Sequence, residues 1–399
     1  MGTKKILLLN ADFVQAYSVS KGLKKAGYYV IAAMPNKMAY GYFSHYPDKK
    51  LISPEDAESK EYYEFVVEAI KKYSADAIIA LDNPSSEFLS HNYEALTGMG
   101  VAVASLPWER FIVAHNKEKL MAFCEERGLS VPRTMPLTVD SVDEVAAYVG
   151  FPAMIKPNIS NGARGIVKVN SLEELKAQVE DSIATYGECT LQQFIDNGDE
   201  YYNVMMYRNR EGKIMPSCII EIQRYFPIVG GSSSFCVTVE NKELTDMCAK
   251  VLDKLDWVGM ADFDVLLDKK EGFKIIEINP RVPASVHAAY ASGINFPEII
   301  ARDILGEKPK EYGYVPGKKL RFLLLDVMWF LKSPKRFRSK ESWFKFFGRD
   351  LYYQDTSKSD PLIFFAGVLN GISKVLDPNY RKAKLGMQSI DIEKVKRGG

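Results

Sequence analysis

Residues 257–281 read WVGMADFDVLLDKKEGFKIIEINPR, and the interpretation of the whole chain starts from this stretch. It contains an apolar run interrupted by aspartates (MADFDVLL), a group of turn-forming residues (DKKEG) and a run in which polar and apolar residues alternate (FKIIEIN). This pattern predicts a β-hairpin. Glu277 and Asn279 are two residues apart on the returning strand, so their side chains leave the same face of the sheet.

Asp264 lies on the first strand of this hairpin, opposite either Ile276 or Glu277. A register shift of one residue would turn its side chain to the other face. Two carboxylates and an amide oxygen on one face are hard ligands that suit Mg²⁺, or Mn²⁺, held jointly with substrate phosphates. Arg281 follows directly and can make a bidentate phosphate contact. The alternative is an acidic hairpin whose polar face is only solvated.

The motif EINPR, with the acidic strand before it and VPASVHAAYASGINFPEIIARDILG after it, resembles the metal-binding end of the ATP-grasp superfamily. The nearest likeness is to the ATP-grasp half of the carbamoyl-phosphate synthetase large chain. The resemblance extends upstream to about Leu106, is loose over the first hundred residues and is absent from the last ninety. It implies ATP as the nucleotide, and Asp264, Glu277 and Asn279 as the metal ligands.

The composition excludes several other classes of protein. Lys and Arg number 52 against 51 Asp and Glu, which gives no indication of nucleic-acid binding. The five cysteines form no C-x-x-C pair, and their odd number favours buried free thiols in a reducing compartment. No signal peptide is recognisable, and the longest apolar run, Leu320 to Leu331, is too short to span a bilayer. A cytoplasmic location is therefore expected.

Strands alternate with helices over the first hundred residues, which predicts a doubly wound parallel sheet. No G-x-G-x-x-G motif follows the first strand, so dinucleotide binding is not expected. Several polar residues follow the predicted strands, where open α/β sheets bind ligands. Each of them can equally be a turn former or a helix cap. They are Asn10, Asp12, Asp82, Asn83 and Glu87.

Two lysines are candidates for binding the nucleotide phosphates. A single helix is predicted from Pro107 to Gly128, and its AHNKEKLMAF segment resembles a superfamily motif that places Lys117 near the phosphates. The alternative for Lys117 is a solvated lysine on a charged helix face. Lys156 ends the predicted strand FPAMIKP, before a small-residue loop whose backbone N–H groups could approach phosphate oxygens. The loop residues assigned to this role are Gly162, Arg164 and Gly165.

The segment TLQQFIDNGDEYYN resembles the superfamily hinge that holds adenine. The resemblance assigns the backbone near Gln193, Phe194 and Ile195 to the adenine edge and Glu200 to the ribose hydroxyls. A glutamine, Gln192 or Gln193, stands where an acid is common, and Gln193 can equally be an ordinary strand residue. By the same resemblance the acceptor pocket is assigned to Arg224, Gly231, Ser232, Ser285 and His287, although a histidine on a helix is more often a buried residue with its hydrogen bonds satisfied.

The fold class predicted for the chain is α/β with an ATP-grasp core, in four parts. These parts are an N-terminal domain (1–106), a lid subdomain (107–190), a large subdomain with the metal site (191–314) and a C-terminal extension (315–399). The extension mixes Trp and Phe with Lys and Arg. This composition suits either a membrane or glycolipid surface, or a partner site, or an aromatic subdomain that caps the ligase body.

The resemblance implies an ATP-dependent carboxylate–amine ligase that acts through an acyl phosphate, with catalytic roles for Lys156 and Arg281. The expected partners are small carboxylate and amine substrates and not nucleic acid, and a homodimer is left open. Two alternatives remain: a bicarbonate-phosphorylating synthetase or carboxylase subunit, and a non-catalytic ATP-binding regulatory module.

Overall fold

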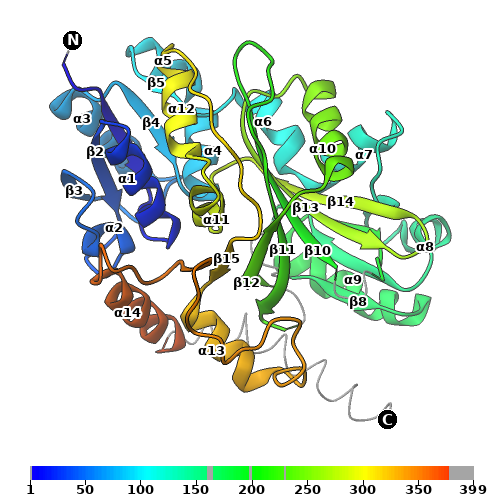
Figure 1. Cartoon of the computed structure of the whole chain (residues 1–399). Coiled ribbons are helices and arrows are strands. Elements are labelled where there is room, and N and C mark those ends of the chain that lie inside the picture. Colours follow the sequence, from blue (N-terminus) through cyan, green and yellow to red (C-terminus); the bar gives the residue numbers. More distant parts are fainter. Residues whose placement is uncertain (1, 160–164, 197–199, 229–230, 377–399) are drawn as a thin grey trace.

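The computed structural model describes residues 2–159, 165–196, 200–228 and 231–376. Three sheets organise this part of the chain: a parallel sheet near the N-terminus, a small antiparallel sheet and a large mixed sheet. In Figure 1 the parallel sheet lies on the left, and the other two lie to its right. The predicted α/β class is confirmed.

The N-terminal sheet has the strand order β3-β2-β1-β4-β5, and all its pairings are parallel. Ile6 and Leu8 pack toward α1, whereas Leu7 and Leu9 pack toward α3 and α4, because successive side chains leave opposite faces of a strand. The predicted doubly wound sheet is therefore confirmed. The strands are β1 (Lys5–Leu9), β2 (Tyr29–Met34), β3 (Lys49–Ile52), β4 (Ala77–Ala80) and β5 (Ala102–Val103), and the helices are α1 (Gln15–Lys25), α2 (Tyr40–Phe43), α3 (Lys60–Tyr73), α4 (Asn83–His91) and α5 (Tyr93–Gly98).

The single helix predicted from Pro107 to Gly128 is wrong. The structure has two helices, α6 (Trp108–His115) and α7 (Lys117–Glu125), separated by Asn116 in an extended conformation. The Asn116 side chain accepts a hydrogen bond from the backbone N–H of Lys119 at 3.1 Å, so it caps a new helix instead of continuing the old one. This break puts Lys117 in the first turn of α7.

The small sheet has the strand order β6-β9-β7-β8, and its hydrophobic core is closed by α8 and α9. All neighbouring strands of this sheet pair antiparallel. The elements are β6 (Thr134–Leu137), α8 (Val142–Val149), β7 (Ala153–Pro157), β8 (Val167–Val169), α9 (Leu172–Tyr186) and β9 (Cys189–Gln193).

The large sheet has the strand order β14-β13-β10-β11-β12-β15-β16. One face packs against α6, α7 and α10, and the other packs toward α1, α11 and α12, so the N-terminal sheet and the large sheet share a core. The elements are β10 (Tyr201–Arg208), β11 (Cys218–Phe226), β12 (Ser232–Val239), α10 (Lys242–Lys254), β13 (Gly259–Asp268), β14 (Gly272–Asn279), α11 (Val286–Ala291), α12 (Phe296–Ile304), β15 (Lys319–Arg321) and β16 (Leu351–Tyr353).

The C-terminal extension is built into this sheet. Strand β15 pairs antiparallel with β12, β16 adds to β15, and two helices follow the strands, α13 (Leu323–Lys332) and α14 (Ile363–Leu376). The Asp355 carboxylate accepts the first two N–H groups of α13, from Leu323 and Leu324, each at 3.0 Å. Burial raises the pKa of Asp355 to about 6.

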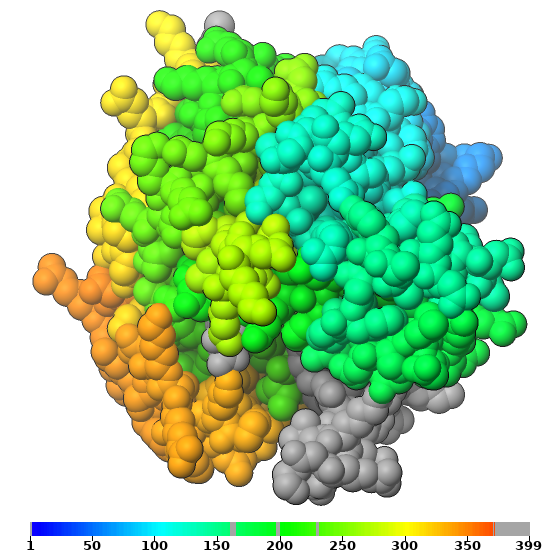
Figure 2. Space-filling view, turned by 90° about the vertical axis from the view of Figure 1, so that its right-hand side faces the viewer, coloured from blue at the N-terminus to red at the C-terminus, as the bar shows by residue number. Residues whose placement is uncertain are grey.

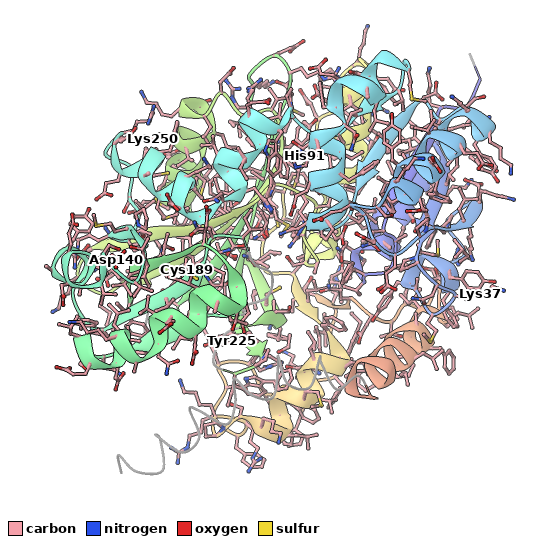
Figure 3. All side chains as sticks on the ribbon, turned by 180° about the vertical axis from the view of Figure 1, so that it is seen from behind. Lys37, His91, Asp140, Cys189, Tyr225 and Lys250 are labelled. Atoms are coloured by element: carbon pink, nitrogen blue, oxygen red, sulfur yellow. The ribbon has the colours of Figure 1, made fainter. Side chains whose placement is uncertain are left out.

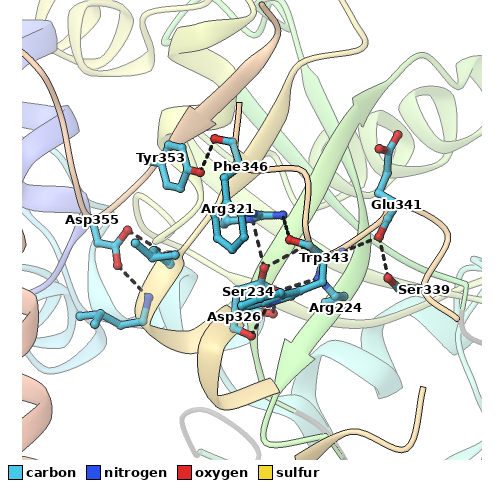
Figure 4. Close-up of polar contacts among 12 residues, drawn as sticks. Arg224, Ser234, Arg321, Asp326, Ser339, Glu341, Trp343, Phe346, Tyr353 and Asp355 are labelled. Carbon is cyan, nitrogen blue, oxygen red and sulfur yellow. Dashed lines mark hydrogen bonds and ion pairs between the residues drawn. The ribbon is translucent and has the colours of Figure 1, made fainter. Parts of the chain in front are cut away.

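A buried ion cluster holds the extension to the sheet (Figure 4). Arg224 of β11 makes two hydrogen bonds to Asp326 of α13, at 2.7 and 3.0 Å, and Arg321 of β15 lies 3.1 Å from the same carboxylate. The Arg224 guanidinium also lies over the Phe235 ring, 4.0 Å from its centroid. These charged side chains can be buried because each guanidinium lies beside the Asp326 carboxylate.

All five cysteines are buried free thiols, as the odd count predicted. Within the described ranges, no helix has both the length and the apolar character that crossing a membrane would require.

Candidate active site

The hairpin β13–β14 brings four acidic or amide side chains to one face of the large sheet. Asp264 pairs with Glu277, and Asp262 pairs with Asn279, with a bulge directly after Asp264. The structure therefore selects one of the two registers that the sequence left open, the one with Asp264 opposite Glu277. Since paired residues in an antiparallel ladder share a face, these four side chains are neighbours.

Asp264 is surrounded by hydrogen-bond donors and by other acids. Tyr201 donates its hydroxyl proton to Oδ1 at 2.9 Å, Asn203 donates to the same oxygen, and Asn279 donates from Nδ2 to Oδ2 at 3.3 Å. Burial and the neighbouring charge of Glu277 raise the pKa of Asp264 to about 7 despite these donors. A bound divalent cation would relieve this repulsion and favour the ionised form of Asp264.

Asp262 was missed by the sequence interpretation, although its two-residue spacing from Asp264 puts both on one face. It is buried, and its Oδ1 makes no hydrogen bond to any described residue. Burial, followed by the charge of Asp264, raises its pKa well above the ordinary range. Tyr201 and Asn203 were missed as well, because the sequence does not show which strand lies beside β13.

The donor set can be tested against Mg²⁺. Among the residues with described positions, no group of three or more His, Cys, Asp or Glu side chains could hold a metal by itself. Asp264, Glu277 and Asn279 instead supply two carboxylates and one amide. This set fits a cation that completes its coordination with water and phosphate oxygens, as Mg²⁺ commonly does.

Two buried lysines face the hairpin. Lys117 Nζ lies 3.4 Å from Glu277 Oε2, and Lys156 Nζ donates to Gln192 Oε1 at 2.5 Å. Burial, together with the positive charge of Lys117, lowers the pKa of Lys156 to about 8. The backbone N–H of Lys117 donates to Asn158 O at 3.0 Å, which ties the start of α7 to the end of β7. Both predicted phosphate-binding lysines thus lie beside the predicted metal ligands.

The glycine loop is only partly described. Gly162 and Arg164 lie outside the described residues. Gly165 has a φ of +73°, and a Cβ there would lie 2.7 Å from Pro157 Cγ. Both the backbone conformation and the available space therefore require glycine at this position.

The predicted adenine hinge follows β9. The N–H of Phe194 donates to Pro152 O at 3.2 Å, so an adenine contact in this segment would have to use other backbone groups, such as those of the buried Ile195. Gln193 accepts the Arg133 N–H at 3.3 Å through its side chain. Glu200 lies exposed at the start of β10 and accepts a hydrogen bond from the Tyr202 hydroxyl at 2.8 Å.

Arg281 joins the hairpin to the N-terminal sheet. Its Nε donates to Asn83 Oδ1 at 2.5 Å, and its Nη2 donates to Asn279 Oδ1 at 3.2 Å. Asn83 begins α4, after Asp82, which caps that helix and accepts a hydrogen bond from Asn10. Of the polar residues after β1 and β4, Asn83 therefore contacts the end of the hairpin directly, and Asn10 is linked to the cap of the same helix through Asp82.

Replacement of Asn83 by alanine is expected to lower kcat about tenfold, because Arg281 would lose the group that orients its guanidinium. Asn83→Asp, which keeps an acceptor oxygen, should retain most of the activity. Asn92→Ala, between α4 and α5, is the matched control. Steady-state kinetics and thermal unfolding of the original chain and the three variants would separate an orienting role of Asn83 from a purely structural one. An unchanged kcat with a lowered melting temperature in Asn83→Ala would mean that Asn83 is purely structural.

A cavity of about 350 Å³ lies between the N-terminal sheet and the large sheet. It is lined by residues of β4, β5, α6, α12 and the start of β13, and it meets the hairpin through Pro280, Arg281 and Val282. Asp264, Glu277, Lys117 and Lys156 do not line it. The cavity therefore borders the site only at Arg281.

The residues assigned to the acceptor pocket do not form one group. Arg224 is fully buried against Asp326, so a substrate contact would require that ion pair to open. Ser232 is exposed at the start of β12, directly after Gly231, whereas Ser285 is buried before α11. His287 is buried and shares a hydrogen bond of 2.9 Å with Ser18 Oγ. This environment agrees with the alternative given for His287, a buried histidine whose hydrogen bonds are made within the protein.

Burial and the nearby Lys21 lower the pKa of His287 from 6.5 to about 3. The unfolded chain therefore binds a proton between these pH values that the folded chain does not bind, and stability falls as the pH falls below 6.5. From pH 7 to pH 5 this histidine should lower the free energy of unfolding by about 2 kcal/mol. Urea unfolding at pH 7 and pH 5 measures this difference in the free energy of unfolding. The difference should become smaller in His287→Gln and should stay the same in the exposed control His91→Gln. Equal pH dependence in both variants would contradict the assignment.

Known proteins resemble this chain over the segment that forms the candidate site. Residues 116–308 match the family model described as carbamoyl-phosphate synthase L chain, ATP binding domain. The carbamoyl phosphate synthase large chain of Thermotoga neapolitana is 27% identical over 320 residues, which cover 75% of this chain and 28% of that protein. D-alanine–D-alanine ligase B of Pseudomonas putida is 23% identical over 220 residues, which cover 51% of this chain and 65% of that protein.

The chain thus spans less than two thirds of the length of either relative. Among solved structures, biotin carboxylase from Campylobacter jejuni has the same fold, with a TM-score of 0.66 and 17% identity, over 78% of this chain and 74% of that one. The matched segment contains Lys117, Lys156 and the whole β13–β14 hairpin. Residues 116–308, which hold these side chains, therefore resemble the ATP-binding domain of the carbamoyl-phosphate synthase large chain, within the fold shared with biotin carboxylase.

Proposed function

We propose that the chain is an ATP-dependent carboxylate–amine ligase that works through an acyl phosphate. The observation that carries the proposal is the meeting of two buried lysines, Lys117 and Lys156, with Asp264 and Glu277 on the hairpin. Charges of both signs gathered in one largely buried place are suited to hold a ligand that itself carries both signs, such as a metal-bound triphosphate.

Each side chain has a role in this proposal. Asp264, Glu277 and Asn279 would hold Mg²⁺, which when bound supplies charge neutralisation at the β- and γ-phosphates. Lys156 and the backbone around Gly165 would bind the α- and β-phosphates. Lys117 and Arg281 would stabilise the negative charge on the transferring phosphoryl group. No Ser or Cys nucleophile is needed, because positioning and charge stabilisation carry such transfers.

The proposed reaction has two steps. A carboxylate oxygen of the substrate attacks the γ-phosphorus, the bond to the bridging oxygen of ADP breaks, and an acyl phosphate forms. The amine of the second substrate then attacks the acyl carbon, phosphate leaves, and the proton of the amine passes to solvent. ADP, phosphate and an amide are the products.

A second candidate is phosphorylation of bicarbonate. It is favoured by the match of residues 116–308 to the carbamoyl-phosphate synthase model and by the biotin carboxylase fold.

The test is phosphate release from ATP and Mg²⁺ over a panel of amino acids and uronic acids, with hydroxylamine as a trapping amine. Formation of a hydroxamate that depends on one carboxylate would support the acyl phosphate, and Lys156→Met should abolish it. Release that needs bicarbonate alone would support the second candidate. ATP binding without turnover on any substrate would contradict both and favour a regulatory module.

A further inference from the structure

The end of the molecule formed by residues 331–349 exposes an unusual amount of aromatic surface. Phe347 is 91% exposed, Phe337 71%, and both Phe344 and Leu331 59%. Phe337 and Phe344 are neighbours, with ring centroids 6.5 Å apart, and both contact Phe330. Exposed apolar groups that gather in one place, unlike single ones, commonly mark an interaction site.

The same residues are strongly basic. Residues 331–349 contain seven Lys or Arg and one acid, Glu341. Lys319 of β15 lies 2.5 Å from Glu341, and the next acid along the chain, Asp350, lies 2.7 Å from Lys318. Lysines outside the segment therefore pair with both acids, and Lys340 of the segment pairs with Glu221 of β11. Seven basic residues against one acid still give residues 331–349 a net positive charge.

Helix α14 adds a second apolar strip beside it. Leu362, Phe365 and Leu369 are exposed at helical spacing, while Ile363 and Ala366 are buried on the opposite side. A Cβ at Gly367 would meet the side chains of Tyr40 and Leu324, so α14 packs against both α2 and α13. Figures 1 and 3, which view the molecule from opposite sides, both place α13 and α14 at its lower end.

The space-filling view shows residues 320–350 (orange) projecting at the lower left of the molecule (Figure 2). From these observations we propose that the basic aromatic face, residues 331–349 with the exposed side of α14, docks the protein on an anionic lipid bilayer. The rings would enter the boundary between headgroups and acyl chains, and the Lys and Arg side chains would contact the lipid phosphates.

A bilayer fits this face better than a protein does. Protein interfaces are poor in lysine, whereas this face carries Lys332, Lys335, Lys340 and Lys345 among its rings. A second copy of the same face would bring like charges together without acids to offset them. A bilayer accepts both features at once, because long basic side chains can reach the headgroups while neighbouring rings insert.

Co-sedimentation of the full chain with two kinds of vesicle tests the proposal: phosphatidylcholine alone, and phosphatidylcholine mixed with phosphatidylglycerol. Binding is expected to be about tenfold or more stronger with the anionic vesicles, and to weaken as salt is raised. The triple variant Phe337→Ser, Phe344→Ser, Phe347→Ser should lose about tenfold in binding, and so should Arg336→Glu with Arg338→Glu.

Two controls match these variants. Ile52→Ser with Val139→Ser removes exposed apolar side chains elsewhere, and Lys71→Glu with Lys72→Glu makes the same charge change on α3. Both should bind like the original chain, and thermal unfolding should show every variant folded. Phe347→Ser alone, at the most exposed ring, is the variant least able to disturb folding.

Three results would overturn the proposal. The first is equal binding to both vesicles or to neither. The second is binding to a soluble polyanion such as heparin that competes with vesicles and ignores the serine substitutions. The third is a dimer, seen by light scattering, that the serine substitutions disperse.

Discussion

Glu277→Gln is expected to lower ATP-dependent phosphate release about a hundredfold, which corresponds to about 3 kcal/mol in the activation barrier. The substitution keeps the size of the side chain and removes one negative charge from the face where Asp264 and Glu277 are paired across the hairpin. A glutamine still offers one oxygen but attracts a divalent cation far less than a carboxylate does.

The measurement is steady-state turnover over a range of Mg²⁺ concentrations. If Glu277 holds the cation, the variant should need more Mg²⁺ for half-maximal activity and should recover part of its rate when Mg²⁺ is raised. Glu243→Gln, at an exposed position of α10, makes the same chemical change away from the site and should leave turnover unaltered. If the rate of the variant is lowered but does not depend on the Mg²⁺ concentration, Glu277 is not a metal ligand. Its ion pair with Lys117 would then explain the loss.

Asp326→Asn is expected to lower the free energy of unfolding by about 3–5 kcal/mol, the range measured when one member of a buried ion pair is removed. The Asp326 carboxylate is buried and serves both Arg224 and Arg321. Without its charge, two guanidinium groups would remain in a largely apolar surrounding.

Urea unfolding of this variant should be compared with that of Asp350→Asn. Asp350 forms an exposed ion pair with Lys318, so its loss should cost far less stability than the loss of the buried carboxylate. Similar losses in the two variants would show that the buried cluster contributes little to stability.

The parts of the fold that follow from local patterns could be predicted from the sequence. The hairpin and the doubly wound sheet were predicted because each strand carries its own periodicity and its own turn residues. The break at Asn116 was not, because residues 108–125 keep a helical pattern on both sides of the cap. Only the capping bond from Asn116 to the Lys119 N–H, which depends on local geometry, reveals it.

The same distinction applies to the candidate site: residues in local motifs could be predicted, and contacts between distant segments could not. Lys156, Asp264, Glu277 and Asn279 were found because they lie in motifs with a recognisable spacing. Asn83 remained one of several options, since its contact with Arg281 spans 198 positions and no local pattern encodes it. Arg224 was assigned to the acceptor pocket by the resemblance, and no local pattern shows that Asp326, 102 positions later, will pair with it.

The pairing of β15 with β12 has a consequence for truncation and for unfolding of the protein. A polypeptide ending at Gly317 would leave β12 as an unpaired edge strand. It would also leave the buried Arg224 guanidinium without the Asp326 carboxylate that pairs with it. Such a fragment should aggregate and not simply behave as a shorter version of the protein. Residues 318–376 are thus an integral part of the fold, and we expect them to unfold together with residues 116–308 in one cooperative transition.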